Sequence, residues 1–343
     1  LGDVYKRQVI NGAFSPDGGP KANYTTNLNM CETSNKGFEL ALNTRNIITK
    51  NFTWSSSVTF NHNKEKINKL SGGDSDVLNN GDTGYALALG EAINSYYHYK
   101  LDGVWQKGEE TDAAVFGAAP GDLKINIPNL VKESDGRFYK IDEETGSAAV
   151  DENGNVIYYT SDNKYTPSDA DYQILGHNSP DWSLGFQNNF TWKDFDLSVF
   201  VYARYGQMFA YDMLTSYDPK GIRNFPTYFN YWTENNPSND FPAANANKGL
   251  EQYTGYYALR YVDGSFIKIK NITLGYSLPK SILKSAGIEK CRFYATITNP
   301  FVFAKSHLLK DYDPEMNGSL KYPLTKQFVF GVNAVSYTHL RAH

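Results

Sequence analysis

Residues 261–279 form one long, two-faced segment that constrains the fold of this chain more than any other. Successive side chains of a β-strand point to opposite faces, and here Ile267 and Ile269 alternate with Lys268 and Lys270. After Asn271 the apolar side chains occupy the other parity. Such a switch predicts a β-bulge or a change of environment along one strand. A strand that passes from a wet rim into a lipid-facing band would show this pattern.

Alternation of apolar and polar side chains recurs along the chain and predicts a set of strands. The alternating segments are residues 37–42, 52–60, 97–105, 182–192, 195–204, 292–298 and 327–333, with a further strand expected around residues 83–89. Several approach the roughly 9–11 residues that a tilted strand needs to cross a bilayer. The mean strand of a soluble protein has only about 5–6 residues, so these lengths favour a membrane-spanning sheet.

The predicted connections alternate between short and long. The short links are residues 44–51, 193–194 and 279–290, and the long links are residues 106–181, 206–263 and 304–326. Outer-membrane barrels combine short periplasmic turns with long extracellular loops. If the chain has about nine strands, the short links lie at one end of the sheet and the long links at the other. The sequence therefore predicts an all-β fold, part of a transmembrane antiparallel β-barrel with long extracellular loops.

Composition excludes several other classes. No run of about 18 apolar residues occurs, so a transmembrane helix is excluded. The net charge is −4 and the basic residues are scattered, so nothing indicates a nucleic-acid partner. No glycosidase dyad, nucleophile elbow, metalloprotease helix or phosphate-binding loop is recognisable. We therefore expect neither an enzyme nor a bound cofactor.

Aromatic residues make up 15% of the chain and collect at the ends of the predicted strands. The rings at these ends are Trp54, Trp105, Trp182, Trp192, Tyr205 and Tyr276. Girdles of Trp and Tyr are expected at both membrane interfaces of a barrel. Large rings that cap the core of a soluble barrel or sandwich would give the same pattern, so the rings alone leave both alternatives open.

Three local features complete the predicted organisation of the chain. Residues 1–8 and 335–343 resemble translated sequencing adapters, and we expect them to be non-native, which leaves residues 9–334 as one unit. The best helix signal is residues 279–286, for which Gly287 would be the C-terminal stop. Cys31 and Cys291 have no metal-binding spacing and are expected to be isolated thiols.

Five segments, in the same order along the chain, resemble the SusC/RagA family of TonB-dependent outer-membrane transporters. They are SNKGFEL at 34–40 with the aromatic stretch 52–64, YKLDGVWQ at 99–106, ILGHNSPDW at 174–182 with FDLS at 195–198, DGSFIKIKNITLGYSLP at 263–279, and TNPFVF at 298–303 with YDPE at 312–315 and YP at 322–323. Together they cover nearly all of residues 9–334. The resemblance implies the C-terminal part of a barrel of about 22 strands, with the plug and the TonB-contacting segment expected outside this chain.

By this resemblance, the expected function is import of glycan fragments or peptides across the outer membrane of a Gram-negative, Bacteroidetes-like cell. TonB would supply the energy, and a SusD-like surface lipoprotein and outer-membrane lipid would be further partners. Two alternatives stay open: a siderophore-type TonB-dependent receptor and a secreted carbohydrate-binding β-sandwich. An open sheet leaves unpaired edges, so in isolation we expect poor folding or aggregation.

The long link around residues 211–261 holds the candidate ligand contacts, namely Trp232, Tyr253, Tyr256 and Tyr257. Exposed rings among asparagines suit stacking on sugar faces, and the same rings suit a loop that packs on itself or on a partner. Both interpretations stay open at this point.

A second candidate is the oxygen-rich turn at Asp151, Glu152 and Asn153. It resembles a D-x-N-G-D-G element that often occurs in the family, and such a loop could hold Ca²⁺. This copy lacks the second Asp-Gly and a suitably spaced bidentate glutamate, so a solvated turn is expected. The histidines His62, His98 and His177 share no ligand spacing, so no metal site is predicted.

Overall fold

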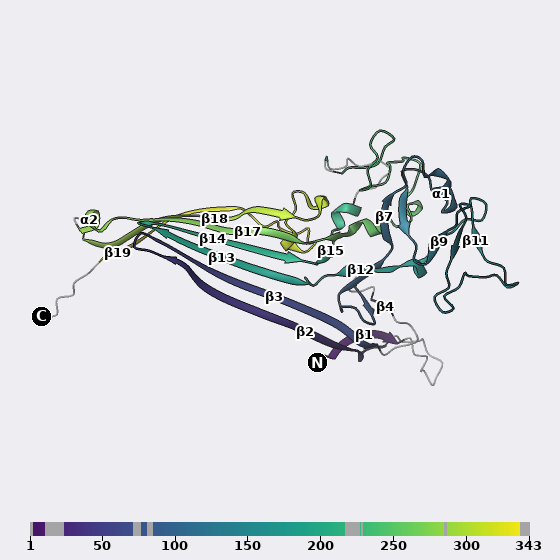
Figure 1. The fold of residues 1–343 in the computed structure, drawn as a ribbon, viewed down its shortest axis with the longest axis horizontal. Coiled ribbons are helices and arrows are strands. Elements are labelled where there is room, and N and C mark those ends of the chain that lie inside the picture. Colours follow the sequence, from purple (N-terminus) through teal and green to yellow (C-terminus); the bar gives the residue numbers. More distant parts are fainter. Residues whose placement is uncertain are drawn as a thin grey trace.

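The computed structural model describes residues 3–10, 24–70, 77–80, 85–216, 227, 229–284 and 287–336. One large antiparallel sheet of long strands extends from a group of packed loops (Figure 1). Within the described residues, no helix is both long and apolar enough to cross a membrane.

The large sheet contains eight strands, and each neighbouring pair runs antiparallel. In sheet order they are β1 (Asp3–Ile10), β2 (Tyr24–Ile48), β3 (Phe52–Leu70), β13 (Trp182–Trp192), β14 (Phe195–Tyr205), β17 (Phe266–Ser277), β18 (Ile288–Ala304) and β19 (Gln327–Ser336). Residues 3–8 and 335–336 belong to β1 and β19, and the non-native origin of the chain ends stays a prediction.

Short turns and long links alternate strictly between these strands from β2 onwards. The turns are residues 49–51, 193–194 and 278–287, and they lie at the end marked by the short helix α2 (Lys280–Leu283) in Figure 1. The long links are residues 71–181, 206–265 and 305–326, and they form the loop group at the opposite end. The predicted segregation of short and long links is therefore confirmed.

The prediction that residues 83–89 and 97–105 are barrel strands is wrong. The strands in these regions lie in smaller sheets within the first long link. β3 instead pairs directly with β13, from Phe52 opposite Trp192 to His62 opposite Trp182. Alternation is a local property of a segment, and it does not reveal which strands become neighbours.

The loop group is built from short elements. Its sheets are β4 (Val77–Asn80), β5 (Tyr85–Ala88), β6 (Ser95–His98) and β12 (Gln173–His177); β7 (Lys100–Val104) with β8 (Leu123–Asn126); β9 (Leu130–Lys132), β10 (Phe138–Lys140) and β11 (Tyr158–Tyr159); and β15 (Met208–Ala210) with β16 (Tyr261–Asp263). Its helical turns are α1 (Glu110–Val115), η1 (Asp169–Asp171), η2 (Asp212–Thr215), η3 (Leu250–Gln252), η4 (Tyr256–Arg260), η6 (His307–Leu309) and η7 (Pro314–Met316).

The large sheet has one apolar and one polar face. Exposed side chains of the apolar face include Phe38, Leu40, Leu42, Ile267, Leu274, Phe293, Phe301, Phe303, Phe328 and Phe330. The opposite face carries Ser55, Ser57, Thr59, Gln187, Asn189 and Ser198. In the part of the chain that the structure describes, no second long sheet covers the apolar face. The apolar side chains of this face are exposed, whereas a sandwich buries them between two sheets, so the fold differs from the alternative of a secreted sandwich.

Aromatic rings form two bands across the apolar face. Towards the loop group, Trp182 stacks on Tyr205 with 5.5 Å between ring centres. Towards the turns, Trp54 stacks on Phe190 at 5.8 Å. Two such bands fit the two interfaces of a bilayer. Trp105, which was predicted for the same girdles, is instead buried within the loop group.

The switch of parity in β17 is a bulge at Lys270. The neighbouring strands β14 and β18 both pair with Ile269 and then with Asn271, so each skips this residue. Because the bulge absorbs one residue, Ile267 and Leu274 lie on the same apolar face and are 53% and 52% exposed. The predicted bulge is confirmed, and it keeps one continuous apolar face along the strand.

The turn between β17 and β18 contains the predicted helix. α2 begins directly after Pro279, whose fixed φ suits the start of a helix. Gly287 follows with a φ of +66°, a left-handed conformation that glycine adopts without strain. Residues 285 and 286 lie outside the described part of the chain.

Two neighbouring substitutions on β17 should separate the faces of the sheet. In the protein that carries these residues, inserted into lipid, we expect Ile272→Arg to destabilise the folded barrel by about 2–4 kcal/mol, because it places a charge on the lipid face near mid-strand. Asn271→Arg lies at the same depth on the polar face and should be nearly neutral. Urea unfolding in lipid, read by heat-modifiable gel migration, measures both effects. Equal destabilisation by the two variants would contradict the assignment of faces.

Candidate functional site

The three long links pack into one loop group, and this group is the candidate functional site. Its buried core draws on all three links: Val104 and Leu123 from the first, Phe209, Tyr211, Leu214, Phe229, Trp232, Phe241, Tyr253, Tyr256, Leu259 and Val262 from the second, and Leu309 from the third. Because these side chains bury apolar surface together, the links hold one another in place.

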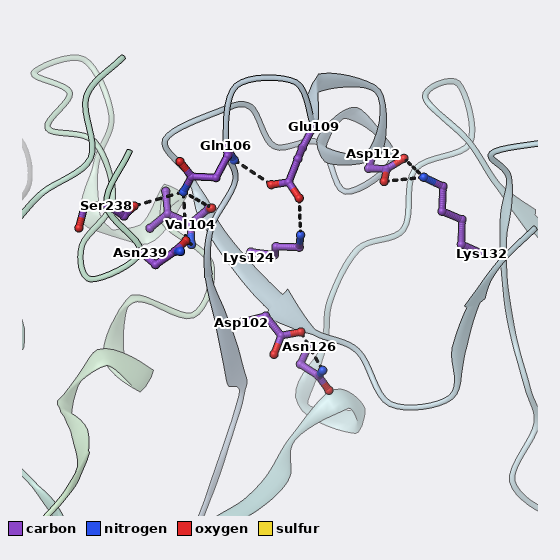
Figure 2. Close-up of polar contacts among 10 residues, drawn as sticks. All are labelled: Asp102, Val104, Gln106, Glu109, Asp112, Lys124, Asn126, Lys132, Ser238 and Asn239. Atoms are coloured by element: carbon purple, nitrogen blue, oxygen red, sulfur yellow. Dashed lines mark hydrogen bonds and ion pairs between the residues drawn. The ribbon is translucent and has the colours of Figure 1, made fainter. Parts of the chain in front are cut away.

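Gln106 joins the first link to the second (Figure 2). Its Nε2 donates to the carbonyl oxygens of Val104 at 2.7 Å and Ser238 at 3.2 Å, and to Asn239 Oδ1 at 3.0 Å. Its Oε1 accepts a hydrogen bond from Trp232 Nε1 at 2.9 Å. A buried donor without a partner costs about 1–3 kcal/mol, so this bond holds the indole of Trp232 in the loop core.

The glycine of the YKLDGVWQ segment allows the two links to approach closely. Gly103 has a φ of +109°, and a Cβ at this position would lie 2.6 Å from Asn239 Oδ1. The same oxygen accepts a hydrogen bond from the backbone N–H of Val104 at 3.2 Å. A larger residue would displace Asn239 and would be strained at this φ.

Glu109 and Lys124 close the first link on itself (Figure 2). The Glu109 carboxylate accepts hydrogen bonds from Lys124 Nζ at 2.7 Å and from the backbone N–H of Gln106 at 2.9 Å. These two hydrogen bonds, that from Lys124 first, lower the pKa of Glu109 below its ordinary value. Lys124 Nζ also lies 4.5 Å from the ring centre of Trp105, which adds a cation–π contact.

Three amide side chains, one from each long link, meet beside the sheet. Gln207 Nε2 donates to Asn317 Oδ1 at 2.8 Å, and Asn178 Nδ2 donates to the same oxygen at 2.9 Å. Asn317 Nδ2 donates in return to Asn178 Oδ1 at 3.0 Å. Amides suit such a junction because each supplies both donors and an acceptor.

A buried ion-pair network attaches the third link to the polar face of β17. Lys268 is fully buried, and its Nζ lies 2.5 Å from Asp313 Oδ2 and 2.8 Å from Glu315 Oε2. Lys270, at the bulge, lies 2.6 Å from Glu315 Oε1. Burial alone would raise the pKa of Glu315, but the hydrogen bonds from the two lysines lower it. The YDPE segment is thus held against the sheet.

Three of the four predicted ligand contacts lie inside the loop core. Trp232, Tyr253 and Tyr256 are only 7%, 4% and 2% exposed, and Tyr253 Oη donates to the carbonyl oxygen of Ala243 at 3.1 Å. Tyr257 is 53% exposed, so this ring alone of the four faces solvent. Packing of the loop accounts for the buried three, and ligand contact by these residues stays a prediction.

A cavity of about 410 Å³ lies between the three links. Its polar and aromatic lining consists of Tyr99, Lys100, Gln173, Asn239, Asp240 and Tyr261. The volume and the mixture of rings, amides, one ammonium and one carboxylate suit a polar ligand held by stacking and hydrogen bonds. Sequence reasoning missed this group because its members come from separate links and show no local pattern.

The predicted oxygen-rich turn is organised by its own hydrogen bonds. Asp151 Oδ1 accepts from the backbone N–H groups of Asn155 and Asn153, each at 2.9 Å. Hydrogen bonds from Asn155 and then Asn153 lower the pKa of Asp151. Among the described residues, no group of three or more His, Cys, Asp or Glu side chains could hold a metal ion.

The three histidines for which the sequence predicted no metal site each form a hydrogen bond with a backbone group. His62 Nδ1 lies 2.7 Å from the carbonyl oxygen of Asp181, His177 Nδ1 lies 2.6 Å from that of Ser179, and His98 Nδ1 accepts from the backbone N–H of Tyr99 at 2.8 Å.

Comparison with known proteins supports the same architecture. The chain is 28% identical over 327 residues to TonB-dependent receptor P3 of Formosa agariphila, and the alignment covers 89% of this chain and 29% of that protein. It is 26% identical over 322 residues to TonB-dependent receptor SusC of Bacteroides thetaiotaomicron, and this alignment covers 91% of this chain and 27% of that protein. The chain thus spans less than a third of the length of these relatives. No family model matches it.

The fold is similar to solved structures of barrel transporters. The RagAB peptide transporter gives a TM-score of 0.63 at 22% identity and covers 96% of this chain and 32% of that chain. The RagAB peptide importer in its closed-closed state gives 0.63 at 22% identity, with 92% and 30% covered. The predicted fold class, a partial transmembrane antiparallel β-barrel, and the predicted resemblance to the SusC/RagA family are confirmed.

Replacement of Lys268 should detach the third link from the sheet. In the protein that carries these residues, we expect Lys268→Met to cost about 3–5 kcal/mol, because it removes the buried cation between Asp313 and Glu315 and leaves Glu315 with Lys270 alone. Hydrogen exchange of residues 305–326 should rise accordingly. Lys305→Met removes an exposed pair with Asp263 and should cost less than about 1 kcal/mol. Equal effects from both variants would contradict the special role of the buried pair.

The loop group should loosen in acid. Because the folded pKa of Glu109 is lowered, its carboxylate contributes stability above the unfolded pKa of about 4.3, and this contribution is lost as the pH falls through the lowered pKa. Tryptophan fluorescence between pH 7 and pH 3, with Trp105 beside Lys124 as a reporter, measures the change. Glu109→Gln should remove this part of the acid transition, and the exposed control Glu234→Gln should keep it. Identical fluorescence profiles for the two variants would contradict the assignment of this transition to Glu109.

Proposed function

We propose that this chain forms the C-terminal wall and external loops of a TonB-dependent outer-membrane transporter. The observation that carries the proposal is the strict alternation of short turns and long links on a sheet with one apolar face. A transmembrane barrel needs an apolar surface towards lipid and a polar surface towards its lumen. The similarity to TonB-dependent receptors supports the same function.

The cargo that we propose is a glycan fragment or a peptide. Supporting it are the rings and amides around the cavity at Tyr99 and Tyr261, which suit sugar faces and peptide groups alike. The RagAB proteins are peptide transporters, which supports the second class. A siderophore-type receptor would use the same barrel and is the alternative.

The partners that we propose follow from the position of the loop group. A SusD-like surface lipoprotein would cover the external loops, whose shared core offers it a firm surface. TonB would act through the rest of the receptor, since this chain matches less than a third of its relatives. The membrane would be the outer membrane of a Gram-negative cell.

Uptake by cells tests the function directly. Deletion of the gene that contains this chain should abolish growth on one oligosaccharide or peptide mixture, and the gene should restore it only where TonB is present. The protein should fractionate with the outer membrane. Restoration of growth on a ferric siderophore instead would favour the alternative, and a soluble protein without heat-modifiable migration would contradict a transporter.

A ring substitution in the same cells tests the predicted ligand contact. Tyr257→Ala should lower uptake at limiting cargo about fivefold, as expected for loss of one stacking interaction of about 1 kcal/mol. Tyr322→Ala removes an even more exposed ring from the third link, where the residue is 96% exposed, and should leave uptake unchanged. Unchanged uptake by the Tyr257 variant would remove this residue from the ligand site.

A further inference from the structure

The end of the sheet opposite the loop group carries a concentration of exposed cations. They are Arg45, Lys50, Lys193, Lys280, Lys284 and Lys290, and we call them the turn-end cations. The exposed acidic residues at the same end of the sheet are Asp194 and Glu289. Asp196 lies nearby but forms an ion pair with Arg292, whose Nη2 lies 2.5 Å from Asp196 Oδ2. The turn end is therefore strongly cationic, although the chain as a whole has a net charge of −4.

The turn-end cations differ in their pairing from several cations of the loop group. None of them forms an ion pair with another residue of the described part of the chain. Loop-group cations with ion-pair partners include Lys124, Lys132, Arg137, Lys140, Lys248 and Arg260. The positive charge at the turn end is thus open to an anion from outside the chain.

The aromatic band gives the depth of these cations. Lys193 follows Trp192 at the end of β13, and its Nζ lies 5.3 Å from the ring centre. Because Trp and Tyr rings lie at the headgroup level of a bilayer, cations just beyond the band reach the level of the phosphates. On α2, the apolar side chain of Ile282 is exposed between Lys280 and Lys284, a combination that suits a membrane surface.

We propose that the turn-end cations bind the headgroups of anionic phospholipids in the leaflet at the turn end. The proposal rests on the proposed function, since it requires the sheet to span a membrane. A phosphodiester oxygen accepts charge-assisted hydrogen bonds from lysine, and each cation near an anionic surface contributes roughly a fivefold preference. Ile282 enters the interface while the ammonium groups of Lys280 and Lys284 stay at the phosphates.

The test uses the purified receptor that contains this chain, inserted into phosphatidylcholine bilayers with a minor fraction of phosphatidylglycerol. The turn variant is K50Q/K193Q/K280Q/K284Q. The matched control, K107Q/K164Q/K310Q/K321Q, removes exposed lysines of the long links and changes the net charge equally. Native mass spectrometry of the lipids that remain bound gives the enrichment of phosphatidylglycerol over phosphatidylcholine.

We expect the wild type and the control to enrich phosphatidylglycerol at least fivefold more than the turn variant. The enrichment should fall as salt is added, because exposed charges are screened. Equal enrichment of phosphatidylglycerol by the turn variant and the wild type would overturn this proposal. If both proteins also insert into bilayers of phosphatidylcholine alone, the proposed function stays intact. An equal loss in the control would also overturn it, since net charge would then be the cause. Failure of the wild type to insert into any bilayer would overturn both.

Discussion

Continuous pairing between long strands is the constraint on which the rest of this structure depends. In hydrocarbon, an unpaired backbone group costs several kcal/mol, so each strand must bond to its neighbours along its length. β13 pairs one to one with β3 and with β14, without a bulge on either side. The same register decides which side chains face lipid, because a slip by one residue would turn the whole apolar set to the polar face. The bulge at Lys270 preserves that apolar face where the parity of β17 changes.

The long links are held by contacts that none of them makes alone. Their apolar side chains share one core, and the amides of Asn178, Gln207 and Asn317 join all three beside the sheet. Lys268 then binds the third link to the wall through two carboxylates. A buried cation with two anionic partners specifies one position for the segment that carries them, since any other position leaves a charge unpaired. Loops fixed in this way would present a ligand or a partner protein with a constant surface above the lumen.

Local patterns predicted whatever depends on neighbouring residues in the chain. The two faces of the long strands, the bulge near Asn271, the helix after Pro279 and the alternation of links could all be read from the sequence. The short strands around Tyr85 and Tyr97 were misplaced because alternation is the same in a barrel wall and in a loop. The ring of Trp105 was misassigned for a similar reason: an aromatic side chain at the end of a strand can face lipid or a neighbouring loop, and only the three-dimensional position decides between them.

The candidate site shows the same division more sharply. The sequence by itself determined that the long link around Trp232 is rich in rings, and that strands of this length and pattern form a membrane wall. Only the tertiary structure decided that Trp232, Tyr253 and Tyr256 are buried while Tyr257 faces solvent. It also brought Tyr99, Gln173 and Asp240 around one cavity. The physical reason is that periodicity along a chain reports the face of a strand, whereas burial and convergence depend on contacts between links that lie far apart in the sequence.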